Sequence, residues 1–156
     1  MKLKIMLLVV GIALFSHAAG KANPRTGVSE GKLQPCPDSP NCVSSQSIQP
    51  AHAIEPLTYT GPWPQAKEKL LQTLRSMKRC RIVTEQADYI HAEFTSAIFR
   101  FVDDVEFLAD DLKKLIHVRS ASRVGYSDFG VNRRRVETIR NLIKASHVPL
   151  HETKNP

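Results

Sequence analysis

The chain has 156 residues, and its 22 lysine and arginine residues outnumber 15 aspartate and glutamate residues, for a formal net charge of +7 at pH 7. This length fits one compact domain, and the positive charge favours anionic partners. Aromatic residues make up 6% of the chain and few lie among the basic ones, which argues against a nucleic-acid partner.

The first 18 residues predict a secretory signal peptide. Two lysines precede an apolar run over 5–15, and small residues flank a cleavage site after Ala18. The run is shorter than the roughly 20 residues that cross a bilayer, so we expect no transmembrane segment in the mature chain. Retention as an uncleaved anchor is the alternative. Export to the periplasm or the exterior favours anionic lipid, glycan or cell-wall polymer as partner.

Residues 19–48 predict an extended arm, because they are rich in Pro, Gly, Ser and Asn and have no apolar period. The spacing of Cys36 and Cys42 suits a disulfide that closes a small loop, which export permits. Such a bridge would contribute on the order of 2 kcal/mol. Cys80 has apolar neighbours and is predicted to be a buried thiol, although its pairing with either other cysteine stays open.

The next segments predict short strands and one helix. Residues 53–59 suit an edge strand that Pro56 interrupts. Apolar residues at helical spacing predict a helix over 64–77. Alternation of apolar and polar residues then predicts a hairpin of 81–85 with 89–95.

A second hairpin is predicted from 99–107 and 116–123, where apolar and charged residues alternate again. We choose the register that brings opposite charges together across the strands. It pairs Phe107 with Ile116, Val105 with Val118, Asp104 with Arg119, Asp103 with Ser120 and Phe101 with Ser122.

A last helix is predicted over 132–145, with Asn132 as its N-cap. The element order predicts an α+β fold: an antiparallel sheet of about four strands, two helices packed on one face, and the N-terminal arm with its cysteine loop. We expect a single domain over 49–146 and a loose C-terminal tail over 147–156.

Three segments carry a resemblance to a known family. They are CPDSPNCVSS at 36–45, RFVDDVEF at 100–107 and RSASRVGYSDFGVNRRRVE at 119–137. In these segments, which span most of the mature chain, the protein resembles the bacterial and plant family known as domain of unknown function 1499. The resemblance implies a small exported or lumenal domain, and it transfers no catalytic residue.

The candidate site lies in the segment 119–135. Three consecutive arginines fall in the first turn of the predicted last helix, where the helix dipole disfavours each exposed cation by roughly 0.3–1 kcal/mol. Two explanations stay open: surface ion pairs, or binding of a carboxylate or phosphate by arginines and helix amides. For the second explanation, the predicted ligand-binding residues are Arg119, Arg123, Ser127, Asp128, Asn132, Arg133 and Arg135.

We therefore expect a noncatalytic binding module for an anionic small molecule, lipid or envelope component, with no cofactor and no metal. One alternative is a hydrolase or transferase that uses Asp103, Ser120 and Ser122 with support from an arginine. A pocket joining these three residues would favour the enzyme, whereas a closed polar cluster would count against it. The other alternative is a structural envelope protein, which predicts a large exposed apolar patch.

Overall fold

The computed structural model describes residues 25–145 of the chain. The predicted signal peptide (1–18) and C-terminal tail (147–156) lie outside the described residues. Within the described part, no helix has the length and apolar character that a membrane crossing requires.

The described residues form two helices and eight strands, and the longer elements lie close to their predicted ranges. In chain order they are β1 (Val28–Ser29), β2 (Lys32–Leu33), β3 (Cys42–Ser44), β4 (Leu57–Thr58), α1 (Trp63–Ser76), β5 (Cys80–Glu85), β6 (Tyr89–Thr95), β7 (Val102–Asp110), β8 (Leu115–Ser122) and α2 (Val131–Ala145).

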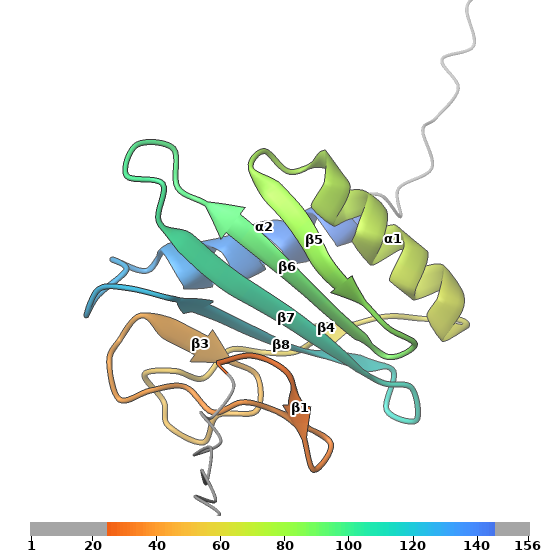
Figure 1. Cartoon of the computed structure of the whole chain (residues 1–156). Coiled ribbons are helices and arrows are strands. Elements are labelled where there is room, and N and C mark those ends of the chain that lie inside the picture. Colours follow the sequence, from red (N-terminus) through yellow and green to blue (C-terminus); the bar gives the residue numbers. More distant parts are fainter. Residues whose placement is uncertain (1–24, 146–156) are drawn as a thin grey trace, which may run out of the picture.

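Six of these strands form one sheet (Figure 1). The order is β3-β8-β7-β6-β5, and β4 also pairs with β8; every strand pair is antiparallel. The prediction of about four strands was too low. Of the two further strands, β4 lies within the predicted edge strand 53–59, whereas β3 comes from a short segment without apolar alternation; both pair with the free edge of β8. β5 ends the sheet on the other side, and its pairing with β6 has an irregularity between Ile82 and Thr84.

Both helices cover the same face of the sheet, as predicted (Figure 1). Pro64 fits the first turn of α1, where a missing N–H costs nothing. One core joins the helices to the sheet. Its fully buried members include Leu70 and Leu74 of α1 and Ile139 of α2, which lie in the same apolar cluster as Phe107 of β7. This core fixes the helices over the strands and leaves the opposite face of the sheet to the arm.

The arm contacts that opposite face. Leu33 of β2 packs with Tyr89 and Leu108 in a second, small apolar cluster. The predicted disulfide between Cys36 and Cys42 is confirmed, with an S–S distance of 2.01 Å. Cys80 is a free, partly buried thiol, and its burial raises the pKa to about 11.

The predicted register of β7 and β8 was wrong by two residues. Phe107 lies opposite Val118, and Glu106, not Asp104, lies opposite Arg119. The strands extend to Asp110 and from Leu115, so the turn between them is shorter than the gap between the predicted strands 99–107 and 116–123. A two-residue shift keeps every side chain on its predicted face but changes all cross-strand partners. Asp103 consequently faces Ser122 across the strands, and Ser120 faces Val105.

The start of α2 also differs from the prediction. Asn132 is not the N-cap but a fully buried residue within the first turn. Asp128 takes the capping role: its carboxylate accepts hydrogen bonds from the backbone N–H groups of Asn132 at 2.7 Å and Gly130 at 2.9 Å. Gly130 has a φ of +77°, a backbone conformation that favours glycine.

Candidate functional site

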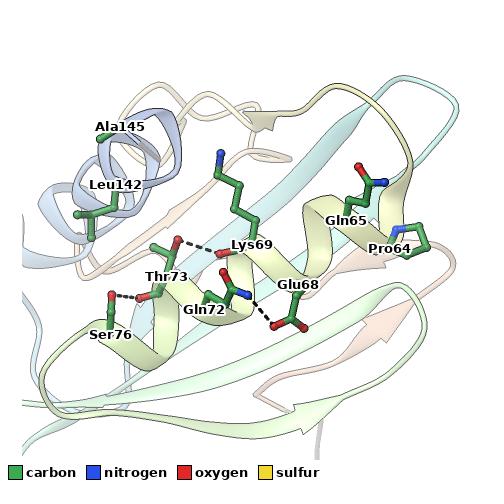
Figure 2. Close-up of a pocket in the computed structure, with 9 residues that line it drawn as sticks. All are labelled: Pro64, Gln65, Glu68, Lys69, Gln72, Thr73, Ser76, Leu142 and Ala145. Carbon is green, nitrogen blue, oxygen red and sulfur yellow. Dashed lines mark hydrogen bonds between the residues drawn. The ribbon is translucent and has the colours of Figure 1, made fainter. Parts of the chain in front are cut away.

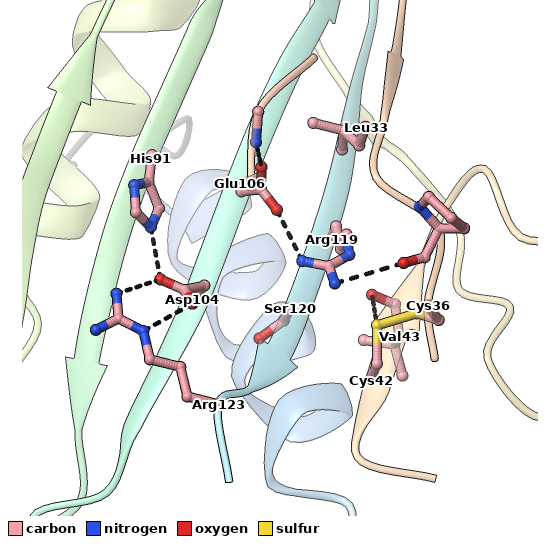
Figure 3. A network of polar contacts seen from close by, with 12 residues as sticks. Leu33, Cys36, Cys42, Val43, His91, Asp104, Glu106, Arg119, Ser120 and Arg123 are labelled. Atoms are coloured by element: carbon pink, nitrogen blue, oxygen red, sulfur yellow. Dashed lines mark hydrogen bonds and ion pairs between the residues drawn. A yellow bond between two sulfur atoms is a disulfide. The ribbon is translucent and has the colours of Figure 1, made fainter. Parts of the chain in front are cut away.

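Two polar clusters lie on opposite faces of the sheet because side chains alternate along β7. Asp104 and Glu106 belong to the face that the arm covers, whereas Asp103 belongs to the face under the helices. Figure 3 shows the arm-side cluster, in which Arg119 and Arg123 of the β8 segment point toward these two carboxylates.

Glu106 holds the arm-side cluster together. Its Oε2 accepts a hydrogen bond from Arg119 Nη1 at 2.8 Å, and its Oε1 accepts from the Tyr89 hydroxyl at 2.8 Å and from Gly27 N–H at 2.6 Å. Glu106 is 0% exposed and Arg119 is 5% exposed. Burial and then the Glu106 carboxylate raise the pKa of Tyr89 well above its ordinary value, so its hydroxyl stays a donor. The cluster thereby ties three strands to the arm.

Asp104 forms the second half of the cluster. Its Oδ1 pairs with His91 Nε2 and accepts from Arg123 Nη2, both at 2.7 Å, and its Oδ2 accepts from Arg123 Nε at 2.9 Å. Burial alone would raise the pKa of Asp104, but the hydrogen bonds from Arg123 and His91 outweigh burial and hold this pKa well below its usual range. Asp104 is therefore an ionised acceptor whose two oxygens are both occupied.

A cavity of about 480 Å³ opens beside this cluster, between the cysteine loop and the end of β8. Its volume lies in the range of about 300–1,000 Å³ that small-molecule sites occupy. The ionisable side chains along its wall are Arg25, Arg119, Arg123 and Asp104, so three cations face one carboxylate. The Cys36 end of the disulfide and the residues next to it form the opposite wall.

The guanidinium of Arg119 uses only part of its hydrogen-bonding capacity. Its side chain is 7% exposed, yet Nε has no hydrogen-bond partner in the described part of the chain. Nη2 reaches the Pro35 carbonyl only at 3.5 Å (Figure 3). A buried donor without an acceptor costs about 1–3 kcal/mol, which an acceptor in the cavity would offset.

Short hydrogen bonds hold the helix-side cluster together. Arg135 Nη2 donates to Asp103 Oδ2 at 2.5 Å, and Arg135 Nη1 donates to Asn132 Oδ1 at 2.6 Å. Ser120 donates to the same Asn132 oxygen at 2.5 Å, and Asn132 Nδ2 donates to Ser122 at 3.0 Å. Ser120 and Asn132 have no exposed surface. Asp103 lines a surface hollow beside the start of α2, whereas Ser122 lines the arm-side cavity, so neither of these hollows joins Asp103, Ser120 and Ser122. This separation counts against an enzyme site at the three residues, and the buried contacts of Asn132 give it a structural role.

The arginines at the start of α2 have intramolecular acceptors. Arg133 donates to the carbonyls of Ala53 at 2.8 Å and Ala51 at 3.2 Å, and Arg134 donates to the carbonyl of Phe129 at 2.9 Å. Neither of the two explanations from sequence included backbone carbonyls as the partners of these cations. Within residues 25–145, only Arg135 of the three forms an ion pair with an acidic strand residue, Asp103. Helix α2 thus tolerates three arginines in its first turn because each guanidinium has an acceptor within the chain.

The seven predicted ligand-binding residues do not come together in one place. Arg119 and Arg123 line the arm-side cavity, Asn132 and Arg135 lie in the helix-side cluster, and Arg133 contacts the segment before β4. Ser127 is exposed and accepts a hydrogen bond from Phe129 N–H within its loop, while Asp128 caps α2.

Sequence reasoning did not assign the partners Tyr89, His91, Glu106 and Arg25 to the site. The alternation of β6 and β7 could have placed His91 near Asp104, since both lie on the face away from the helices. No pattern in the sequence pointed to Arg25, which reaches the cavity only because the arm crosses the sheet. Across residues 25–145, no group of three or more histidine, cysteine or carboxylate side chains is placed to hold a metal ion.

A larger groove of about 860 Å³ lies between α1 and α2 (Figure 2). The hydrogen bonds drawn there stay within α1, from Gln72 to Glu68, from Thr73 to the Lys69 carbonyl and from Ser76 to the Thr73 carbonyl. Its charged side chains are not set against a buried partner. The smaller cavity beside Arg119 is therefore the better candidate for a binding site.

The comparison with protein families confirms the resemblance that the three sequence segments indicate. Residues 32–143, well over half of the chain, match the family described as "Protein of unknown function (DUF1499)". The match includes the cysteine loop, the whole arm-side cluster except Gly27, helix α1, and helix α2 up to Ile143. The chain therefore belongs to the DUF1499 family.

Proposed function

We propose that this protein is an exported, noncatalytic binding domain that holds a carboxylate or phosphate group in the cavity between the cysteine loop and β8. The group belongs to a small molecule or to an envelope component. The disulfide supports export, because such bonds persist in oxidising compartments.

The buried guanidinium of Arg119 is the observation that carries the proposal. Its Nε–H has no acceptor among residues 25–145, and its side chain lines the cavity. Arginine is suited to this task because its planar array of donors matches the oxygens of carboxylate and phosphate groups. A bound oxygen beside Arg119 would satisfy the donor that the protein leaves unpaired.

The charges around the cavity favour an anion. Asp104 is the only carboxylate among its lining residues, and Arg123 and His91 already occupy both of its oxygens. Arg25 is exposed at the cavity and donates one hydrogen bond, to the Arg123 carbonyl at 3.1 Å. An entering anion would therefore meet donors rather than free acceptors.

The start of α2 is a weaker candidate for the same ligand. The amides of Gly130 and Asn132 already donate to Asp128, which acts as an internal anion at this position. The guanidinium of Arg133 donates to two backbone carbonyls. This comparison moves the proposed site from the helix start to the cavity.

Isothermal titration with inorganic phosphate, citrate and succinate, at low salt, tests the proposal. We expect Arg25→Gln to weaken binding of the best of these probes about ten- to hundredfold, the effect of one charge-assisted hydrogen bond. Arg25 is exposed and its loss leaves the core untouched. Arg134→Gln, which removes an equal charge at the helix start, is the matched control and should change affinity less than threefold. Absence of binding by all three anions, or an equal loss in both variants, would refute the cavity as an anion site.

A further inference from the structure

The exposed aromatic side chains of the described residues gather at one end of the sheet. Phe99 and Phe101 lie in the β6–β7 loop, and Tyr126 and Phe129 lie in the β8–α2 loop. These four are the only aromatic residues within 25–145 whose side chains are exposed; Phe129 is 87% exposed and Phe99 is 72% exposed. None of the four contributes to the core, so folding does not explain their apolar character.

Both loops lie at the same end of the sheet, at the left of Figure 1. Arg123 N–H donates to the Val102 carbonyl at 3.2 Å, which joins the end of β8 to the start of β7. The rings of Phe99 and Phe101 stack with their centroids 5.5 Å apart. We call this region, formed by the loops 96–101 and 123–130 with the turn 77–79 beside them, the aromatic end.

Basic residues surround these aromatic side chains. Lys78, Arg79, Arg100 and Arg134 are exposed. Lys78, Arg79 and Arg134 line the same surface hollow at this end of the molecule. Asp103 lines the same hollow, but it pairs with Arg135. Of the other carboxylates nearby, Asp128 caps α2 and Asp38 lies in the cysteine loop. The aromatic end is therefore both apolar and positive.

The opposite end of the sheet lacks this excess of positive charge. Lys113 and Lys114 pair there with Asp110 and Asp111 at 2.8 and 2.7 Å. Lys67 pairs with Glu85 at 3.3 Å, and Asp88 is a fourth carboxylate. The loops of this end expose one large apolar side chain among the described residues, Leu112. A molecule whose positive charge gathers at one end takes a preferred orientation in the field of a negatively charged surface.

We propose that the aromatic end docks on the surface of a lipid bilayer that contains anionic lipids. Phe99 and Phe129 enter the interfacial layer, and the arginines beside them meet the headgroups, as aromatic and basic side chains do at membrane interfaces. The aromatic residues stand on separate loop tips among exposed cations rather than along a groove, which fits a bilayer better than a folded partner. This proposal is independent of the anion cavity.

Co-sedimentation of the full chain with vesicles tests the proposal. We expect at least tenfold stronger partitioning onto vesicles of phosphatidylglycerol and phosphatidylcholine than onto phosphatidylcholine alone. The double variant Phe99→Ser/Phe129→Ser should partition at least tenfold more weakly than the wild type. The matched control, Ile48→Ser/Leu112→Ser, removes two equally exposed apolar side chains elsewhere and should change partitioning less than twofold. Residues 1–24 are common to all variants, so their contribution cancels in the ratios between variants, which carry the test.

Fluorescence quenching by brominated lipid gives a second, position-specific test. Trp63 is the one tryptophan of the chain, and its Nε1 donates to the Ala87 carbonyl at the opposite end of the sheet. We expect Trp63 to escape quenching on anionic vesicles, whereas a tryptophan introduced by Phe99→Trp in a Trp63→Phe background is quenched at least twofold. Equal quenching at both positions, no quenching at position 99, or unchanged partitioning of the double serine variant would overturn the proposal. A protein partner at this end would show itself as no vesicle binding, which also overturns it.

Discussion

Replacing Arg119 with methionine should destabilise the fold far more than the same change at Arg81. Both arginines pair with a carboxylate on a neighbouring strand, Arg119 with Glu106 at 2.8 Å and Arg81 with Glu93 at 2.6 Å. They differ in burial: the Arg119 side chain is 7% exposed and the Arg81 side chain is 68% exposed. The two substitutions therefore compare a buried and an exposed ion pair with the chemistry held constant.

The expected magnitudes follow from this difference in burial. Arg119→Met leaves the carboxylate of Glu106 buried without a counter-charge, which costs about 3–5 kcal/mol in the free energy of unfolding. Arg81→Met removes a solvent-screened pair and costs about 0–1 kcal/mol. At about 4 °C per kcal/mol for a domain of this size, the melting temperature should fall by about 12–20 °C for Arg119→Met and by less than about 4 °C for Arg81→Met.

Urea unfolding monitored by circular dichroism measures both values, and a double variant tests the cause. Glu106→Gln/Arg119→Met removes both charges while glutamine keeps an acceptor for Tyr89 and Gly27. It should recover at least half of the stability that Arg119→Met loses. The reasoning fails if Arg119→Met costs no more than Arg81→Met, or if the double variant is less stable than Arg119→Met alone.

Three further predictions concern single groups. The pKa of Asp104 is held below its ordinary value of about 3.9, so ionised Asp104 stabilises the fold above about pH 4 and this stabilisation is lost as the pH falls toward the folded-state pKa. The difference in unfolding free energy between wild type and Asp104→Asn should therefore shrink between about pH 6 and pH 3. A constant difference would contradict this. Because the pKa of Cys80 is raised from its ordinary 9.0 to about 11, its thiolate fraction at pH 8 is roughly a hundredfold smaller than that of an ordinary cysteine. Thiol titration should therefore show slow labelling of the native chain and, without reductant, one reactive thiol per unfolded chain. Asp128→Ala should cost about 0.5–2 kcal/mol through loss of the α2 cap, measured by urea unfolding beside Ser127→Ala, which should cost less.

The sequence predicted the elements and their faces better than their partners. Alternation along 102–110 and 115–122 assigned each side chain to the correct face, because a strand turns its side chains with a fixed period of two. Alternation does not fix the offset between two strands, and any even shift satisfies it equally well. Charge pairing then favoured Asp104 with Arg119, whereas the structure pairs Glu106 with Arg119 and gives Asp104 to Arg123.

Long-range contacts account for most of what the sequence did not reveal. The first-turn arginines of α2 indicated an unusual helix start, but the acceptors of Arg133 are the carbonyls of Ala51 and Ala53, about 80 residues earlier in the chain. The cavity likewise forms only because the arm crosses the sheet. The path of the arm could not be predicted, because its sequence has no apolar period. Local patterns therefore identified the unusual residues but not the groups that they contact.

The two borders of the sheet have a consequence for how the protein stays soluble while it folds. An open strand edge can pair with another chain and begin aggregation. β5 interrupts its pairing ladder between Ile82 and Thr84 and carries Arg81 and Glu85, which are exposed. The other border is divided between the short strands β3 and β4. Neither border offers a long, flat and uncharged ladder, so the sheet is protected against growth by addition of a foreign strand.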